Sequence, residues 1–329
     1  MTLLSTPPPI TGLSAVVTGG SRGLGLLLAR ELGHRGCAVT IAARDRDELQ
    51  EATTLLAPHA PGGVHPEVCD VRERHQVREL FARTADRTGG VDIVIGNAGI
   101  IQVGPVDDLG IDGFDAAMSA IFSGAVHTAL EALPYLRRSP AGGRLALIGS
   151  VGGLFAVPHL LPYSCAKSAV AALAEGLYAE ERAHGVSVTG VHPGLMRTGS
   201  HLHALFGGDT EQEYAWFSAL NGTPLLSMDA ERAAERIITG IQRRRPRLVL
   251  TPAARLGSAL HGGAPVTVTR MSAVLARALP ERTGNSVLAE GRTADAARSG
   301  RRNRFLRRWT ARNERAADRF NQRSGRRGS

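Results

Sequence analysis

The sequence predicts an α/β fold in which helices pack against a parallel β-sheet. Short runs of apolar and β-branched residues alternate with longer amphipathic stretches, which is the pattern of successive strand–helix–strand units. A glycine-rich segment directly follows the first apolar run and leads into an amphipathic stretch. With 329 residues, 43% of them hydrophobic, the chain is long enough for one large α/β domain and an appendage.

Seven segments have the composition of buried strands, namely residues 15–18, 39–42, 64–69, 92–95, 144–148, 187–191 and 247–250. Amphipathic periodicity predicts helices near residues 24–35, 46–56, 73–87, 113–137, 163–184 and 229–242, and a further helical segment over about 252–279. We expect residues 1–9 to be a flexible lead and residues 10–280 to form the domain, with a substrate-covering insertion at 199–228. Residues 281–329 should form a basic, loosely ordered tail.

The formal net charge of +9 comes from this tail. Residues 281–329 contain 14 Arg and 5 Asp or Glu, which leaves 25 basic and 25 acidic residues in the rest of the chain. A neutral body gives no reason to expect a nucleic-acid partner. Phe305, Trp309, Ala316 and Phe320 fall on one side of a helix predicted over 303–323. We expect first that this stripe docks on the body of the protein or stays disordered. Weak contact with an anionic membrane surface is the second alternative, and contact with nucleic acid is the last.

The three cysteines, Cys37, Cys69 and Cys165, fit neither a disulfide framework nor the spacing of metal ligands. We therefore expect reduced thiols, no metal site and a cytoplasmic location. The N-terminus lacks the charged and apolar segments of a signal peptide. The apolar run at 145–161 contains three glycines and Pro158, which favours a buried strand and a loop over a membrane span.

The segment after the first predicted strand is suited to binding phosphate. It reads Thr18-Gly19-Gly20-Ser21-Arg22-Gly23-Leu24-Gly25. The glycines allow the backbone to turn sharply and approach a pyrophosphate, whose oxygens bind free N–H groups at the start of the following helix. A tight turn alone would explain the glycines equally well. The strand–turn–helix setting favours a dinucleotide site on a Rossmann-type, doubly wound sheet.

The end of the second predicted strand favours NADP(H) over NAD(H). An NAD-selective site has an acidic side chain there, but this chain has Ala43, and Arg44 follows it. Arg22 lies within the glycine turn, so two guanidinium groups and no carboxylate are available to a 2′-phosphate. The alternative is that Arg44 opens a charged surface helix. Asp70 and Val71 follow the third strand, where they are placed to contact the adenine. The alternative is that Asp70 caps the next helix.

Three further residues suggest a catalytic site. Tyr163 and Lys167 are four positions apart on a predicted helix and therefore share a face. Lys167 is the only lysine in the chain, against 38 arginines. Its compact ammonium can bind ribose hydroxyls and lower the pKa of a nearby tyrosine toward use as a general acid–base. Ser150 ends the fifth strand, where ligands bind in open α/β sheets, and its hydroxyl can bond a substrate oxygen.

Over about residues 10–255 the chain resembles the short-chain dehydrogenase/reductase family. The resemblance rests on the glycine motif, Asp70, Asn97-Ala98-Gly99, Ser150, the Tyr163-x-x-x-Lys167 pair, and Pro193-Gly194 followed by Thr198. It implies a seven-stranded parallel sheet in a single domain, here with a C-terminal helical extension. It also implies metal-free hydride transfer between a carbonyl and an alcohol (EC class 1.1.1) on a small molecule, and homo-dimers or tetramers.

The resemblance also assigns roles to individual residues. It implies that Asn97, Ala98 and Gly99 support the sheet beside the cofactor and that Thr198 contacts the nicotinamide amide. The residues expected to bind NADP(H) are Thr18, Gly19, Ser21, Arg22, Gly23, Leu24, Gly25, Arg44, Asp70, Val71, Asn97, Ala98, Gly99, Tyr163, Lys167, Pro193, Gly194 and Thr198.

The sequence departs from the family pattern at Ile121. The family has an asparagine at this position, which holds a water between the lysine and solvent. Ile121 puts this proton relay in doubt, although Ser119 or Ser123 is close enough in sequence to substitute. The departure leaves an alternative to an active enzyme, namely an NADP-binding sensor or scaffold with impaired catalysis. A smaller departure is Gly96, where an asparagine often precedes the Asn-Ala-Gly triplet.

The segments expected to cover the site, residues 151–162 and 195–226, are mostly apolar. Their large apolar side chains are Leu154, Phe155, Leu160, Leu161, Met196, Leu205, Phe206, Trp216 and Phe217. Such a lining suits a lipophilic ketone, aldehyde or alcohol. The same side chains would equally well pack a dimer interface or the core of the lid. His159, His201 and His203 are expected to be structural or solvated rather than to polarise a substrate.

Overall fold

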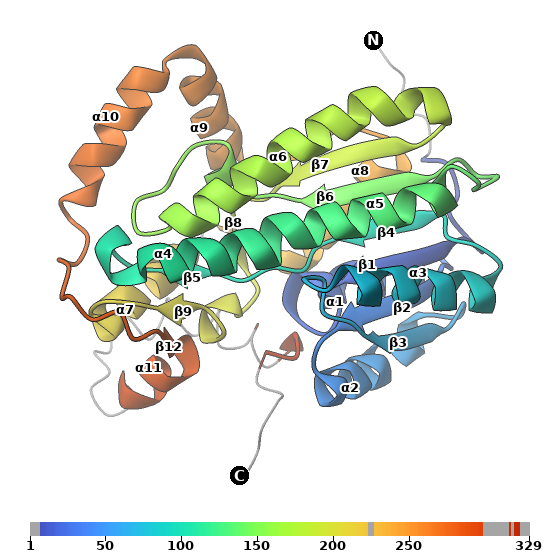
Figure 1. The fold of residues 1–329 in the computed structure, drawn as a ribbon, viewed down its shortest axis with the longest axis horizontal. Helices are drawn as coiled ribbons and strands as arrows, with labels where there is room; N and C mark the ends of the chain where they lie inside the picture. The colour runs from blue at the N-terminus through green and yellow to red at the C-terminus, as the bar shows by residue number, and fades with distance from the viewer. Residues whose placement is uncertain (1–6, 223–226, 299–315, 317–318, 323–329) are drawn as a thin grey trace.

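A seven-stranded parallel sheet forms the centre of the molecule (Figure 1). The computed structural model describes residues 7–222, 227–298, 316 and 319–322. The sheet has the strand order β11-β7-β6-β4-β1-β2-β3, and its paired strands are parallel. Its strands are β1 (Ser14–Thr18), β2 (Ala38–Ala43), β3 (Val64–Val68), β4 (Ile93–Gly96), β6 (Arg144–Ile148), β7 (Ser187–His192) and β11 (Arg247–Val249).

All seven strands predicted from the sequence are present, with ends that differ from the prediction by no more than one residue. The prediction worked because the central strands are covered on both faces. Every residue of β1, β4 and β6 is buried, and such strands have nearly continuous apolar sequences. The expected doubly wound α/β fold is therefore confirmed.

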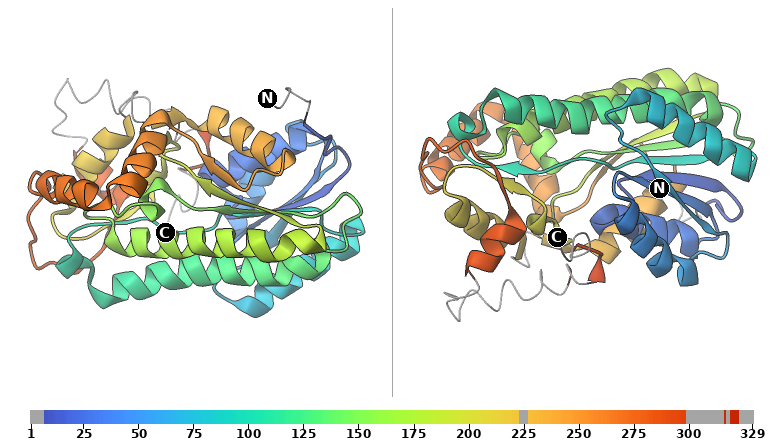
Figure 2. Two further views of the ribbon diagram at one scale, coloured as in Figure 1. Left: turned by 90° about the horizontal axis from the view of Figure 1, so that it is seen from above. Right: turned by 60° about the horizontal axis from the view of Figure 1, so that its bottom comes forward.

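Helices cover both faces of the sheet (Figure 2). One face is covered by α1 (Gly23–His34), α2 (Arg46–Leu56) and α8 (Ala230–Gln242), the other by α3 (Arg74–Thr88), α5 (Gly124–Leu136) and α6 (Leu161–Glu181). Successive residues of β1 alternate between the two cores. Ala15 and Val17 pack with α1, α2 and α8, whereas Val16 packs with α3, α5 and α6.

The winding of the sheet reverses at β1. The chain passes from β1 to β2 and β3 on one side and then returns to β4 on the other side of β1. The carboxyl ends of β1 and β4 therefore border a crevice, which is where open α/β sheets bind ligands. The glycine-rich turn follows β1, and Asn97 follows β4, so the fold brings both motifs to this crevice.

The helix predicted over 113–137 starts earlier and is irregular. α4 (Val106–Ala117) has a kink at Gly110, a π-helical turn occupies Met118–Ser123, and α5 continues from it. The whole run, Val106–Leu136, is long and apolar enough to cross a membrane by length and composition alone. Buried core helices pass the same test, and Ala117, Ile121 and Ala129 of this run are core residues.

Smaller elements build a second layer at the carboxyl edge of the sheet. They are the three-stranded sheet of β5 (Gln102–Val103), β9 (Leu205–Phe206) and β12 (Ala289–Glu290), the pair β8 (Leu195–Arg197) and β10 (Ser227–Asp229), and α7 (Thr210–Gly222). We call residues 199–222 the lid. Strands of two or three residues are too short to show alternation, so the sequence does not reveal them.

The C-terminal part is more ordered than expected. The helical segment predicted at 252–279 is a pair of helices, α9 (Pro252–Gly263) and α10 (Pro265–Ala276), and the expected loose tail contains β12 and α11 (Gly291–Arg298). Most of the helix predicted over 303–323, with Phe305 and Trp309, lies outside the described residues. Ala316 and Phe320 are described, and both are buried in the core beneath α1 and α8.

Candidate active site

The glycine-rich turn joins β1 to α1 with two residues in the left-handed region. Gly19 has φ +64° and Gly23 has φ +55°, which residues with a side chain rarely adopt. A Cβ atom on Gly25 would lie 1.9 Å from the carbonyl oxygen of Gly19. The first N–H groups of α1 have no carbonyl partner within the helix. The turn therefore has the shape and the donors that a pyrophosphate requires.

Asn97 and Ala98 fasten the end of β4 to this turn. Asn97 Nδ2 donates to the carbonyl oxygens of Thr18 and Gly19, each at 3.1 Å. The backbone N–H groups of Asn97 and Ala98 both donate to Thr18 Oγ1, at 3.0 and 3.3 Å. These bonds hold the end of β4 against the end of β1 and the start of the glycine-rich turn.

Ser150, Tyr163 and Lys167 meet at the end of β6. Ser150 follows the strand, and Tyr163 and Lys167 share one face of α6. The Nζ atom of Lys167 lies 5.8 Å from the centroid of the Tyr163 ring and donates to the carbonyl oxygen of Ile148 at 2.6 Å. Lys167 is only 6% exposed, and Tyr163 is partly buried. The three candidate catalytic side chains therefore lie in one cluster.

Burial dominates the electrostatics of this cluster. It raises the pKa of Tyr163, while a hydrogen bond with the Ser150 side chain acts in the opposite direction. Burial also lowers the pKa of Lys167 to about 8. The sequence predicted that Lys167 would lower the pKa of Tyr163, but desolvation of the phenol is the larger effect here.

Ile121 lies where the resemblance expected an asparagine, close to Lys167. It is buried within the π-helical turn, and a Cβ atom on Gly99 would lie 3.4 Å from Ile121 Cγ1 and 3.9 Å from Lys167 Nζ. The side chain of an isoleucine cannot hydrogen-bond a water. Within the described part of the chain, Lys167 Nζ donates to Ile148 and bonds neither Ser119 nor Ser123.

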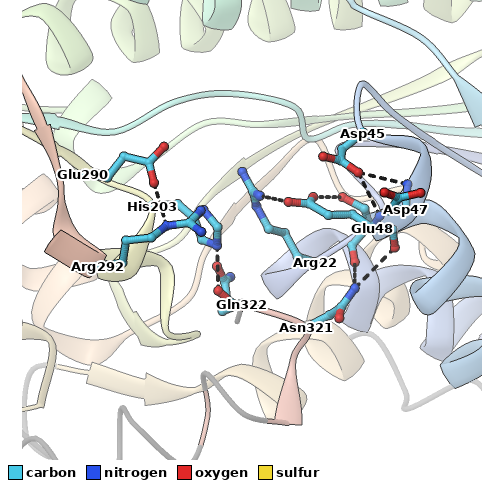
Figure 3. A network of polar contacts seen from close by, with 10 residues as sticks. Arg22, Asp45, Asp47, Glu48, His203, Glu290, Arg292, Asn321 and Gln322 are labelled. Carbon is cyan, nitrogen blue, oxygen red and sulfur yellow. Dashed lines mark hydrogen bonds and ion pairs between the residues drawn. The ribbon is translucent and has the colours of Figure 1, made fainter. Parts of the chain in front are cut away.

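The part of the crevice around Arg22, where we expect the adenosine of a nucleotide and which we call the adenosine end, contains a carboxylate that the sequence did not predict. Glu48, in the first turn of α2, forms an ion pair with Arg22 and accepts a hydrogen bond from Ser21 Oγ at 3.1 Å (Figure 3). Its side chain is only 9% exposed. The expectation of two guanidinium groups and no carboxylate is therefore wrong. Glu48, Leu49, Ala52 and Leu56 form the buried face of α2, and this periodicity was the signal that pointed Glu48 inward.

Arg44 is exposed and its positive charge acts on Asp70. A hydrogen bond from the Arg72 guanidinium is the main cause that lowers the pKa of Asp70, and the charge of Arg44 contributes. Asp70 Oδ1 also accepts from the Arg72 backbone N–H at 3.0 Å. The N-cap residue of α3 is Glu73, so the expected alternative that Asp70 caps this helix is wrong. Val71 is buried against Gly124 on the neighbouring helix.

The segment after β7 is held by contacts with neighbouring loops. The carbonyl oxygen of Pro193 accepts from the N–H of Val151 at 2.8 Å, next to Ser150. Gly194 lies so close to Thr251 that a Cβ atom on it would come within 2.4 Å of the Thr251 hydroxyl. Thr198 is 5% exposed and accepts from the Ser200 N–H at 3.3 Å. These contacts place the start of the Pro193 to Thr198 segment beside Ser150, at the carboxyl end of β7.

The lid has a core of its own. Leu160, Phe206 and Phe217 are buried together with Tyr214, and Trp216 packs against them. His159 bonds the fully buried Glu213 at 2.7 Å, and Trp216 Nε1 donates to the same carboxylate at 2.6 Å. Several of the apolar residues expected to line the substrate pocket therefore hold the lid together, and His159 has a structural partner. Tyr163 borders this cluster.

Comparison with known proteins gives a consistent assignment. A profile described as short chain dehydrogenase matches residues 14–203. A dehydrogenase/reductase SDR family protein 7-like from Drosophila melanogaster is 31% identical over 245 residues, which are 74% of this chain and 73% of that protein. The D-beta-hydroxybutyrate dehydrogenase of Rhizobium meliloti is 30% identical over 186 residues, 56% of this chain and 72% of that enzyme.

Solved structures share the fold. L-Sorbose reductase from Gluconobacter frateurii, complexed with NADPH and L-sorbose, superposes with a TM-score of 0.66 at 20% identity and covers 75% of this chain and 97% of that one. A short-chain dehydrogenase/reductase from Mycobacterium marinum has a TM-score of 0.64 at 24% identity and covers 74% of this chain and 96% of that one. With the profile match over more than half of its length, the chain belongs to the short-chain dehydrogenase/reductase family of oxidoreductases.

Proposed function

We propose that the protein uses NADP(H) to interconvert a carbonyl and an alcohol on a small apolar molecule. The observation that carries this proposal is the buried cluster of Ser150, Tyr163 and Lys167 at the end of β6. The Tyr163 phenol is a proton donor, and the Ser150 hydroxyl can orient a substrate oxygen. The Lys167 ammonium adds a positive charge at the same edge of the sheet. No cluster of three or more potential metal ligands occurs among the described residues, and this chemistry needs none.

Each catalytic residue has a defined task in carbonyl reduction. When bound, NADPH supplies the hydride. Tyr163 donates its proton to the substrate oxygen, and its raised pKa keeps that proton in place at neutral pH. Ser150 donates a hydrogen bond to the same oxygen. Lys167 binds the ribose hydroxyls and stabilises the phenolate that forms at Tyr163.

The preference for NADP(H) rests on Arg22 and Arg44. Ala43 ends β2 without a carboxylate, which leaves room for a 2′-phosphate beside Arg44. Arg22 is one-third exposed, so a phosphate can approach it from solvent while it remains paired with Glu48.

Turnover tests the proposal directly. Purified protein with NADPH and a panel of lipophilic ketones and aldehydes should lose nicotinamide absorbance. Tyr163→Phe should abolish this loss, because the substituted ring has no proton to donate. Tyr178→Phe is the matched control, since Tyr178 lies on the same helix and its hydroxyl bonds Arg182 outside the site. Equal turnover by Tyr163→Phe and wild type would exclude the proposed role of Tyr163.

Ile121 favours a second candidate, an NADP-binding sensor or scaffold with impaired catalysis. The buried isoleucine removes the polar group expected beside Lys167. Ile121→Asn distinguishes the two candidates. A large gain in turnover from a slow wild type would support the sensor, whereas a wild type that already turns over at 1 s⁻¹ or faster, about the lower end of typical enzyme rates, would exclude it.

We further propose a cytoplasmic protein that assembles into homo-dimers or tetramers. The support is the family membership, together with free thiols at Cys37, Cys69 and Cys165. Light scattering after size-exclusion chromatography measures the assembly. A single monomeric species across the working concentration range would exclude it.

A further inference from the structure

The described C-terminal residues 320–322, which we call the strap, lie against the glycine-rich turn. The N–H of Gly23, the first residue of α1, donates to the carbonyl oxygen of Phe320 at 2.9 Å. The side-chain amide of Asn321 donates to the carbonyl oxygens of Ser21 at 3.0 Å and Glu48 at 3.3 Å (Figure 3). Two hydrogen bonds thus join the strap to a turn that lies about 300 residues earlier in the chain, and a third joins it to the first turn of α2.

The strap is a packed part of the molecule. Phe320 is 3% exposed and belongs to the core beneath α1 and α8. Asn321 and Gln322 are also buried. Asn321 has φ +56°, a left-handed conformation that asparagine tolerates better than most residues. The conformation turns its amide toward the glycine turn.

The same segment reaches the lid on the opposite side of the crevice. The carbonyl oxygen of Gln322 bonds His203 Nε2 at 2.7 Å, and the Arg292 guanidinium donates to His203 Nδ1 at 3.2 Å. Burial and the nearby Arg22 charge lower the pKa of His203 to about 4. The imidazole is therefore neutral at physiological pH, with its proton on Nε2, and it donates to the strap.

Gln322 has an unused acceptor in this position. Its Oε1 atom is buried and has no hydrogen-bond partner among the described residues, while its Nε2 atom would be 2.5 Å from a Cβ on Gly23. Buried polar atoms are normally bonded. A ribose hydroxyl is a donor of the kind that Oε1 lacks. The Gln322 side chain thus lies beside the glycine-rich turn, where its Oε1 atom is available to accept a hydrogen bond from a bound nucleotide.

We infer that residues 320–322 are a gate on the cofactor site, which must detach from the glycine turn or the lid before NADP(H) enters or leaves. This inference rests on the proposed function. The strap bonds both borders of the crevice, Gly23 on one side and His203 on the other, and touches none of Ser150, Tyr163 and Lys167. It therefore acts on nucleotide exchange rather than on the proton-transfer step.

The side-chain anchor can be removed without straining the backbone. Asn321→Gly deletes the two amide hydrogen bonds, and glycine adopts φ +56° freely. The matched control is Arg30→Ala, which removes a side chain on α1 whose ion pair is with Glu231 on α8. His203→Ala removes the anchor on the lid side.

Stopped-flow fluorescence of NADPH on the full-length protein measures both rate constants. Asn321→Gly should raise the association and the dissociation rate constants together by about tenfold, because two hydrogen bonds that keep the gate shut are lost. His203→Ala should shift both rate constants in the same direction, and Arg30→Ala should stay within about twofold of wild type. In the nucleotide-free protein, the amides at the start of α1 should exchange hydrogen faster in Asn321→Gly.

The outcomes separate the gate from its alternatives. If the dissociation rate constant of NADPH is unchanged in both Asn321→Gly and His203→Ala, the gate is overturned. If only the association rate constant rises, the strap competes with the nucleotide and does not act as a gate. Unchanged amide exchange at Gly23 would overturn the strap contact itself. A wild type that binds neither NADPH nor NADH would overturn the proposed function, and the gate with it, whereas binding with unaltered release overturns the gate alone.

Discussion

The two ends of the crevice are built in different ways. At the proposed catalytic end, Ser150 follows β6, and Tyr163 and Lys167 lie on α6, the next α-helix in the chain. At the adenosine end, the surroundings of Arg22 come from α2, the lid and the C-terminal strap, which are far apart in the chain. The first arrangement follows from local spacing, whereas the second exists only after the whole chain has folded.

This difference shows where each function can be altered. Lys167 and Tyr163 lie in a cluster whose partners are few and close in sequence. Arg22 belongs to a network of charges and amides in which Glu48, His203 and Asn321 each contribute. We therefore expect large losses from single changes at the catalytic end and smaller, graded effects on cofactor affinity at the adenosine end.

The largest effect should come from Lys167→Met. This change removes the only side-chain amine and leaves a buried apolar side chain of similar length. Turnover should fall by about 10²- to 10⁴-fold, the usual contribution of a catalytic acid–base system. The measurement is kcat with NADPH and a reducible ketone, with far-UV circular dichroism to show that the variant is folded. A loss below about threefold would contradict the role given to Lys167.

Arg44→Ala should have the next largest effect. A charge-assisted hydrogen bond to a phosphate contributes roughly 1.5–3 kcal/mol, and screening at this exposed site favours the lower end. NADPH binding should weaken by about 10- to 100-fold, while NADH binding should change little. Fluorescence titration with both nucleotides gives the two dissociation constants. Equal weakening of both would show that Arg44 does not select the 2′-phosphate.

Raising the pH from 7 to 9 should reduce NADPH affinity and turnover by about tenfold without any substitution. Lys167 has a pKa of about 8, so roughly one-tenth of the molecules retain the ammonium at pH 9. NADPH affinity and turnover should therefore fall as the pH rises through 8. Unfolding through Lys167 does not explain this loss. The pKa of Lys167 is lower in the folded protein than the ordinary value of 10.5, so its contribution to the free energy of unfolding increases as the pH rises from about 8 to 10.5. A flat profile from pH 7 to 9 would contradict the shift.

Glu48→Gln should have the smallest effect and the opposite sign. It removes the carboxylate that neutralises Arg22 but keeps an amide oxygen to accept from Ser21. NADPH should bind a few-fold more tightly, since one negative charge near the 2′-phosphate is lost. Glu51→Gln, on the exposed side of the same helix, is the control. Weaker binding of NADPH to Glu48→Gln would mean that Glu48 positions Arg22 for the phosphate.

The same comparison explains how much could be predicted from the sequence. The seven central strands follow from buried apolar runs, and the meeting of Ser150, Tyr163 and Lys167 follows from one strand end and one helical turn. The Arg22–Glu48 pair required the relative placement of α1 and α2. The contact of Asn321 with Ser21 has no local signal, because nothing in either segment specifies the other. The π-helical turn at Ile121 was likewise hidden in a uniformly apolar stretch.

The single lysine has a practical consequence for labelling experiments. Reagents that acylate amines meet only one side-chain amine in this chain, Lys167, which belongs to the proposed active site. Its lowered pKa makes the free amine available near pH 8, where the α-amino group also reacts and serves as an internal reference. Mass spectrometry of the Lys167 peptide, released by cleavage after arginine, therefore reports how often the buried amine becomes accessible. A bound nucleotide should slow its acylation while leaving the reference unchanged.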